Sequence, residues 1–165
     1  MFRTFRVTTW LFRRLSLTNP AFVRHNAVRL ALMRNKTRQE AVLKSVKIWF
    51  DGTCLGNGTK RARAGAHVYD GRTLRSWPVP GAQTNQRAEL CALLKALELC
   101  EGGETICGDS VYALKLANGQ WRAKVSQDLV GPIRTLMSQK RVRLEWVPSE
   151  RNLADPAKGR EARNV

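Results

Sequence analysis

Hydrophobic and polar residues alternate in several short segments of the chain, and this pattern predicts β-strands. The first segment starts at Val46, is rich in β-branched and aromatic residues, and reaches Asp51-Gly52, where we expect a turn. Two later segments flank Asp70-Gly71, a dipeptide that favours a two-residue hairpin turn. The last alternating segment stops at Pro148. The predicted strands cover residues 46–51, 66–69, 73–79, 105–108 and 141–147.

Three other segments carry apolar residues at helical spacing. The clearest covers residues 84–100, because a capping residue precedes it and Gly102-Gly103 follows it. A second helix is predicted from Asp109-Ser110 to about Leu116, and a third over residues 127–138, with Gly131-Pro132 near its start. The order βββ-α-β-α-α-β predicts an α/β domain: a mixed five-stranded sheet with flanking helices.

Length and composition favour one compact domain. The chain has 165 residues, 43% of them hydrophobic, and no apolar run approaches the 18 or so residues that a membrane span needs. The net charge is +16, from 29 Lys and Arg against 13 Asp and Glu. A positive field of this size attracts nucleic acid or an anionic membrane, and charge alone does not choose between these partners.

Residues 1–44 differ from the rest of the chain. Arginine alternates there with large apolar residues, and the first acidic residue is Glu40. This pattern is typical of a mitochondrial transit peptide, which predicts import into the matrix and a second region over residues 45–165. A basic arm that grips nucleic acid and a membrane-surface helix are the alternatives.

Cysteine and histidine offer little chemistry. Cys54, Cys91, Cys100 and Cys107 form no C-x-x-C pair or zinc spacing, and we interpret them as buried thiols of a reducing compartment. The two histidines, His25 and His67, are too few and too far apart for a histidine metal site.

Four acids are better candidates: Asp51, Glu89, Asp109 and Asp155 stand at predicted strand ends and helix starts. Oxygen ligands suit hard divalent cations, and clustered carboxylates repel one another unless cations offset the repulsion. Two Mg²⁺ ions about 3.5–4 Å apart could activate water and neutralise charge at a phosphodiester. Taken singly, Asp51-Gly52 could be a plain turn and Asp109-Ser110 a helix cap.

The segment from about Val46 to Gly159 resembles ribonuclease H type 1, most closely the eukaryotic enzymes. The resemblance is carried by Asp51-Gly52-Thr53-Cys54 with Asn57-Gly58, Arg63-Ala64-Gly65, Gln83 to Glu89, and Gly108 to Tyr112. It implies a ribonuclease H-like fold and an endonuclease that hydrolyses the RNA strand of RNA/DNA hybrids, leaving 5′-phosphate and 3′-hydroxyl ends.

The resemblance also implies roles for individual residues. Two Mg²⁺ ions, or Mn²⁺ in their place, would be held by Asp51, Glu89, Asp109 and Asp155, with Asp51 shared. Contacts to RNA 2′-hydroxyls fall to Asn57, Asn85 and Gln86, and a DNA-phosphate contact to Thr84. A channel for the DNA strand would be formed by Trp121, Arg122 and Lys124.

The sequence departs from the family pattern in several places. Residues 147–151 lack the histidine-bearing glycine loop of the eukaryotic enzymes, and Glu150 is the candidate substitute. Ala82 replaces an arginine and Ser126 an asparagine, which predicts a weaker DNA-phosphate pocket. No hybrid-binding module is recognisable in residues 1–44.

We therefore expect a monomeric mitochondrial ribonuclease H acting on hybrids. One alternative is a catalytically idle member of the fold that binds RNA, for example as a subunit of the mitochondrial ribosome. The other is a ribonuclease H domain derived from a retroelement, which the segment from Asn152 to Asp155 resembles.

Overall fold

The computed structural model describes residues 28–36 and 46–157. The chain divides into two compact units between Ala41 and Val42. In the first unit, residues 28–36 form a helix with exposed side chains. Most of the predicted transit segment lies outside the described residues, so its role stays a prediction. None of the helices in the described ranges is long and apolar enough to cross a membrane.

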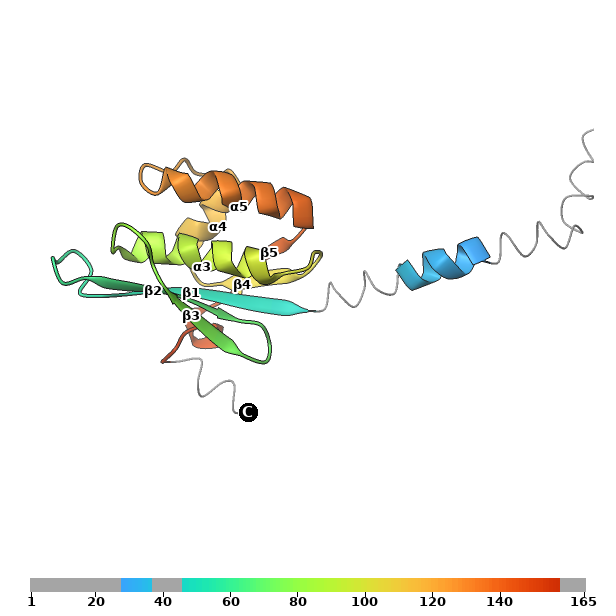
Figure 1. The fold of residues 1–165 in the computed structure, drawn as a ribbon, viewed down its shortest axis with the longest axis horizontal. Helices are drawn as coiled ribbons and strands as arrows, with labels where there is room; N and C mark the ends of the chain where they lie inside the picture. Colours follow the sequence, from blue (N-terminus) through green and yellow to red (C-terminus); the bar gives the residue numbers. More distant parts are fainter. Residues whose placement is uncertain (1–27, 37–45, 158–165) are drawn as a thin grey trace, which may run out of the picture. The chain divides into compact units, whose positions relative to one another are not determined.

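The second unit is built on a mixed five-stranded sheet (Figure 1). Its strands are β1 (Lys47–Leu55), β2 (Arg63–Tyr69), β3 (Leu74–Pro78), β4 (Thr105–Gly108) and β5 (Arg143–Trp146), in the order β3-β2-β1-β4-β5. The first three strands pair antiparallel, whereas β4 is parallel to both β1 and β5. The predicted fold class and element order are confirmed.

Three helices lie on one face of this sheet: α3 (Asn85–Leu99), α4 (Val111–Ala117) and α5 (Gln127–Lys140). Helices α3 and α4 pack against the sheet, and α5 packs on α3 and α4. The core between these elements has fully buried side chains that include Phe50, Leu90, Leu93, Leu97, Ile106 and Ile133. Each such side chain contributes about 1.5–3 kcal/mol through burial. A 3₁₀ turn, η1 (Ser149–Arg151), follows β5.

Helix α3 is fixed at both ends. At its start, the Thr84 hydroxyl accepts a hydrogen bond from the Arg87 N–H at 3.2 Å, which satisfies one of the free donors of the first turn. At its end, Lys140 Nζ donates to the carbonyl oxygens of Leu97 and Cys100 at 2.7 and 2.6 Å. A side chain at the end of α5 therefore caps the carboxyl end of α3.

Two boundaries differ from the sequence prediction in ways that matter for the site. Strand β1 does not end at Asp51-Gly52 but continues to Leu55, because β2 pairs with it as far as Leu55. Strand β5 begins at Arg143 because α5 runs on to Lys140 and Arg141 takes a left-handed conformation, with φ 52°, as its C-cap.

The β2–β3 turn also differs in detail. The Asp70 N–H donates to the Thr73 carbonyl, so the central residues of the turn are Gly71 and Arg72, one position later than predicted. The Asp70 carboxylate accepts from the backbone N–H groups of both Arg72 and Thr73. Burial alone would raise the pKa of Asp70, but these hydrogen bonds favour the charged carboxylate, and the pKa of Asp70 is lowered overall.

Candidate active site

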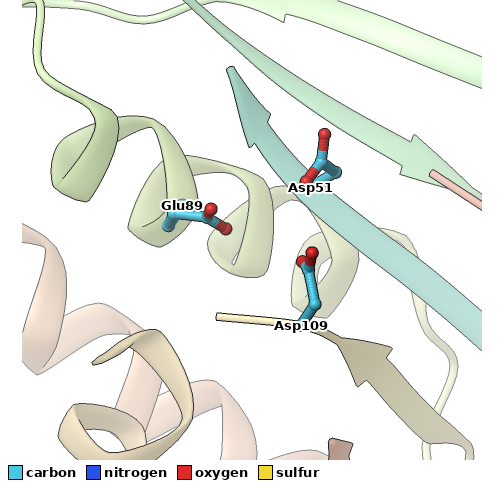
Figure 2. Close-up of side chains that lie close together, drawn as sticks. All are labelled: Asp51, Glu89 and Asp109. Carbon is cyan, nitrogen blue, oxygen red and sulfur yellow. The ribbon is translucent and has the colours of Figure 1, made fainter. Parts of the chain in front are cut away.

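Three of the four predicted acids meet at one point. Asp51 comes from β1, Glu89 from α3 and Asp109 from the residue after β4, and each offers an oxygen that lies within 4.8 Å of the others. Figure 2 shows Glu89 reaching from its helix toward the two aspartates. Asp51 and Glu89 are buried, whereas Asp109 is partly exposed.

The sheet brings the two aspartates together. Strand β1 pairs with β4 only from Lys47 to Trp49. At Asp51, the edge of β1 that faces β4 is therefore no longer paired with that strand. Asp109 directly follows Gly108, the last residue of β4. The two aspartates therefore stand just past the point where the parallel pairing of β1 and β4 ends, and such openings between parallel strands are common positions for ligand sites in α/β sheets.

Two glycines allow this close packing. A Cβ atom on Gly52 would lie 2.3 Å from the Glu89 backbone nitrogen, so only glycine lets α3 rest directly on β1 beside the acids. A Cβ on Gly108 would lie 2.4 Å from the Phe50 ring. Each glycine is the sequence neighbour of an acid in the cluster. Each therefore allows another part of the chain to pack closely beside that acid.

Glu89 is held in an unfavourable setting for a charge. Burial, followed by the charges of Asp51 and Asp109, raises the pKa of Glu89 to about 9, although a backbone hydrogen bond from Gly52 acts in the opposite direction. Its Oε2 is the only buried side-chain oxygen or nitrogen in the described part of the chain without a hydrogen-bond partner. A divalent cation would satisfy this oxygen and offset the repulsion, so the residues present fit a hard metal ion.

Two residues outside the predicted set hold Asp109. The Asn152 amide donates to Asp109 Oδ1 at 2.9 Å and to the Phe50 carbonyl at 3.0 Å. The Trp146 indole N–H donates to the Asp109 backbone carbonyl at 3.1 Å. The sequence offered only a weak signal for either one, an amide and an aromatic residue within a short segment near the last acid.

Asp155 lies outside the group of three. Its Oδ1 accepts a hydrogen bond from the Ala157 N–H at 2.8 Å, and its charge acts on His67. Burial lowers the pKa of His67, and Asp155 works against that shift. Asp155 as a fourth metal ligand stays a prediction. Glu150 is exposed on η1, and its role as a substitute for the loop histidine also stays a prediction.

The residues predicted to contact RNA gather at the start of α3. Asn57, from the loop after β1, accepts a hydrogen bond through Oδ1 from the Asn85 N–H at 3.3 Å. Asn85 and Gln86 are exposed in the first turn, directly after the N-cap Thr84. The three residues predicted to contact RNA and Thr84, predicted to contact a DNA phosphate, therefore lie on one short surface beside the acid cluster.

The predicted DNA-strand residues line a hollow of about 580 Å³. Its walls are Gln86, Tyr112, Gln120, Trp121, Arg122, Lys124 and Val125. The Trp121 ring is 43% exposed, with Lys115 Nζ 4.7 Å from its centroid and the Tyr112 ring at 6.5 Å. An aromatic face flanked by cations suits a nucleic-acid strand. Tyr112, Gln120 and Val125 are additions to the predicted set.

A mixed sheet of this order, with three acids clustered where its central strands separate, defines a ribonuclease H-like α/β fold. The chain belongs to the RNase H family, whose model matches residues 43–158.

Individual relatives agree with this assignment. Ribonuclease H of Schizosaccharomyces pombe is 34% identical over 137 residues, which cover 72% of this chain and 52% of that protein. Ribonuclease H1 of Rattus norvegicus is 51% identical over 102 residues, 53% of this chain and 36% of that protein. The chain thus spans only part of the length of these relatives.

A solved structure supports the same fold. The crystal structure of RNase H1 from Halobacterium salinarum is similar with a TM-score of 0.55 and 25% sequence identity. The match covers 72% of this chain and 97% of that one.

Proposed function

We propose that this protein is an endonuclease that hydrolyses the RNA strand of RNA/DNA hybrids. The observation that carries the proposal is the cluster of Asp51, Glu89 and Asp109, with a buried Glu89 oxygen that has no hydrogen-bond partner. Membership of the RNase H family supports this substrate class. Mutually repelling acids have no evident use in a protein that only binds RNA.

The three acids would hold Mg²⁺, with Asp155 completing a site for two ions and Mn²⁺ as an alternative metal. When bound, such ions activate water and offset charge on the phosphate and the leaving oxygen. The chain's own contribution is to bring the ligands together, since Gly52 lets α3 pack directly on β1 and Gly108 lets the Phe50 ring pack against the end of β4. The products would carry 5′-phosphate and 3′-hydroxyl ends.

The two nucleic-acid surfaces would divide the hybrid between them. Asn57, Asn85 and Gln86 present amides beside the acids, where they can read RNA 2′-hydroxyls. Thr84, at the same helix start, would contact a phosphate. Trp121, Arg122 and Lys124 would hold the DNA strand in the hollow.

We also propose that residues 1–44 direct the protein to the mitochondrial matrix. Their support is the arginine-rich, acid-poor sequence. A fluorescent fusion to the full chain should co-localise with mitochondria, and the same fusion lacking residues 1–44 should not. Equal localisation of the two would contradict this proposal.

The activity is tested with one nucleic-acid sequence prepared in four forms: hybrid, single-stranded RNA, duplex RNA and duplex DNA. The full chain with Mg²⁺ should cut the labelled RNA of the hybrid and leave the other forms and the DNA strand intact. Binding of the hybrid without cleavage, under Mg²⁺ and Mn²⁺ alike, would favour a non-catalytic RNA-binding role. Equal cleavage of single-stranded RNA would contradict recognition of the hybrid.

A further inference from the structure

We propose that Asn152 is a positioning residue that sets the metal affinity of the acid cluster, an inference that rests on the proposed function. Asn152 is fully buried, with 0% of its surface exposed. Its side chain makes three hydrogen bonds, two as a donor and one as an acceptor. A buried amide bonded in this way is fixed in a single orientation.

The two donor bonds tie the strands that carry the aspartates. Asn152 Nδ2 lies 3.0 Å from the carbonyl oxygen of Phe50, the residue before Asp51, and 2.9 Å from Asp109 Oδ1. One amide nitrogen therefore bridges β1 and the end of β4 where the two strands no longer pair. It fixes both the distance between the strands and the rotation of the Asp109 carboxylate.

The remaining bonds organise the turn that leads to Asp155. Asn152 Oδ1 accepts from the Ala154 N–H at 3.2 Å, and the Asn152 backbone carbonyl accepts from the Asp155 N–H at 3.2 Å. Asn152 thus bonds to Asp109, to the backbone of Asp155 and to the residue that precedes Asp51. None of these contacts requires Asn152 itself to touch a metal. Partners that orient ligands in this way commonly change metal affinity or activity by about 10- to 100-fold when they are removed.

A purely structural asparagine would also destabilise the protein on removal, so a matched control is needed. Glu104 is buried too, with 4% exposed, and its carboxylate accepts from the backbone N–H groups of Glu101 and Gly102. It stands before β4, at the opposite end of that strand from Asp109. The substitution Glu104→Ala removes buried polar bonds without touching the acid cluster.

The test compares the full chain with the variants Asn152→Ala, Asn152→Leu and Glu104→Ala. Each protein is measured below its own melting temperature, and circular dichroism checks that it is folded. Isothermal titration with Mn²⁺ measures the dissociation constant, and hybrid cleavage gives kcat and KM. The leucine variant keeps the site filled if alanine prevents folding. The two Asn152 variants should bind Mn²⁺ about 10- to 100-fold more weakly and lose kcat, with KM changed by less than about threefold.

Glu104→Ala should lower the melting temperature and leave Mn²⁺ affinity unchanged. Wild-type Mn²⁺ affinity in a folded Asn152 variant, or an equal loss in Glu104→Ala, would overturn the proposal. If the wild-type chain binds Mn²⁺ but does not cut hybrids, the proposed function fails, whereas the affinities still decide the role of Asn152.

Discussion

Glu89 is a buried carboxyl group whose surroundings in the fold disfavour its ionised form. Its pKa is raised from 4.5 to about 9 by burial and by two neighbouring carboxylates. A carboxyl whose pKa is raised on folding binds more protons in the folded chain than in the unfolded one. The metal-free protein therefore loses stability as the pH rises from 4.5 toward 9, because the unfolded chain then releases a proton that the folded chain retains.

The first prediction concerns this pH dependence. Between about pH 7 and pH 8, the free energy of unfolding of the metal-free protein should fall by up to about 1.4 kcal/mol per pH unit. In Glu89→Gln most of this slope should disappear. Folding lowers the pKa of His67 from 6.5, so its contribution lies mainly below pH 7. The pKa of the Cys100 and Cys107 thiols is raised from 9.0 to about 11, so their contribution lies mainly above pH 8, where the unfolded chain begins to ionise them. Urea denaturation at several pH values measures the slope, and an unchanged slope in the variant would refute the account of Glu89.

The sequence predicted the three clustered acids because each stands in a short motif of the family. It did not predict Asn152 or Trp146 as partners of Asp109, because those bonds join residues 43 and 37 positions apart. Hydrogen bonds of this kind depend on tertiary packing, which leaves no local pattern in the chain. Residue types that carry chemistry are therefore easier to predict than the residues that orient them.

At the scale of the elements, the contact between α3 and β1 decides whether Glu89 reaches the aspartates. The second prediction is that Gly52→Ala destabilises the protein by about 1–3 kcal/mol, since its Cβ would meet the α3 backbone. Displacement of α3 should also weaken Mn²⁺ binding. Chemical denaturation and calorimetric titration measure the two effects.

Gly131→Ala is the matched control for that substitution. Gly131 lies inside α5, and a Cβ there meets nothing within 4 Å. Alanine should leave metal binding unchanged and stabilise the helix by up to about 1 kcal/mol. If Gly52→Ala behaved like Gly131→Ala, the close approach of α3 to β1 would not matter.

The third prediction concerns the end of α3. Lys140→Met removes the ammonium group that donates to the Leu97, Glu98 and Cys100 carbonyls. The loss should cost about 1–2 kcal/mol of stability, because the last carbonyls of the helix lose a charged donor. The rate of hybrid cleavage should stay close to wild type, since the acids lie at the other end of the helix. A stability equal to wild type in urea would contradict this capping role.

Periodicity in the sequence predicted which helices and strands form better than it predicted where they end. Apolar spacing located all five strands and the three helices of the second unit, because burial on one face imposes it. The continuation of β1 past Gly52 was missed, since a local turn signal was outweighed by pairing with β2. Local sequence cannot show which neighbouring strand will supply hydrogen bonds.

At the scale of the whole molecule, the +16 charge should govern association with nucleic acid. The fourth prediction is that log affinity for an RNA/DNA hybrid falls linearly with log salt, because bound phosphates release counterions. Lys124→Gln, in the Trp121 hollow, should reduce the slope by about 1. The control Arg72→Gln, in the β2–β3 turn, should leave it unchanged, and equal slopes in all three proteins would remove Lys124 from the interface.

Family membership was predictable for the region that carries the motifs, and the match over residues 43–158 confirms it. Residues 1–44 contain no such motifs, so their proposed import role rests only on their arginine-rich, acid-poor composition. Composition can favour a targeting segment over a folded one, but it does not specify contacts.

The most direct test of the central claim is single-turnover cleavage of an RNA/DNA hybrid by the full chain and by Asp109→Asn, across a range of Mg²⁺ concentrations. The substitution keeps the volume and an oxygen for the Asn152 bond while it removes a ligand charge. Wild-type cleavage should rise with Mg²⁺ and vanish in EDTA, and Asp109→Asn should bind the hybrid but cut at least about 100-fold more slowly. Cleavage by the variant at the wild-type rate, or wild-type cleavage that persists in EDTA, would contradict the assignment of the acid cluster as the metal site.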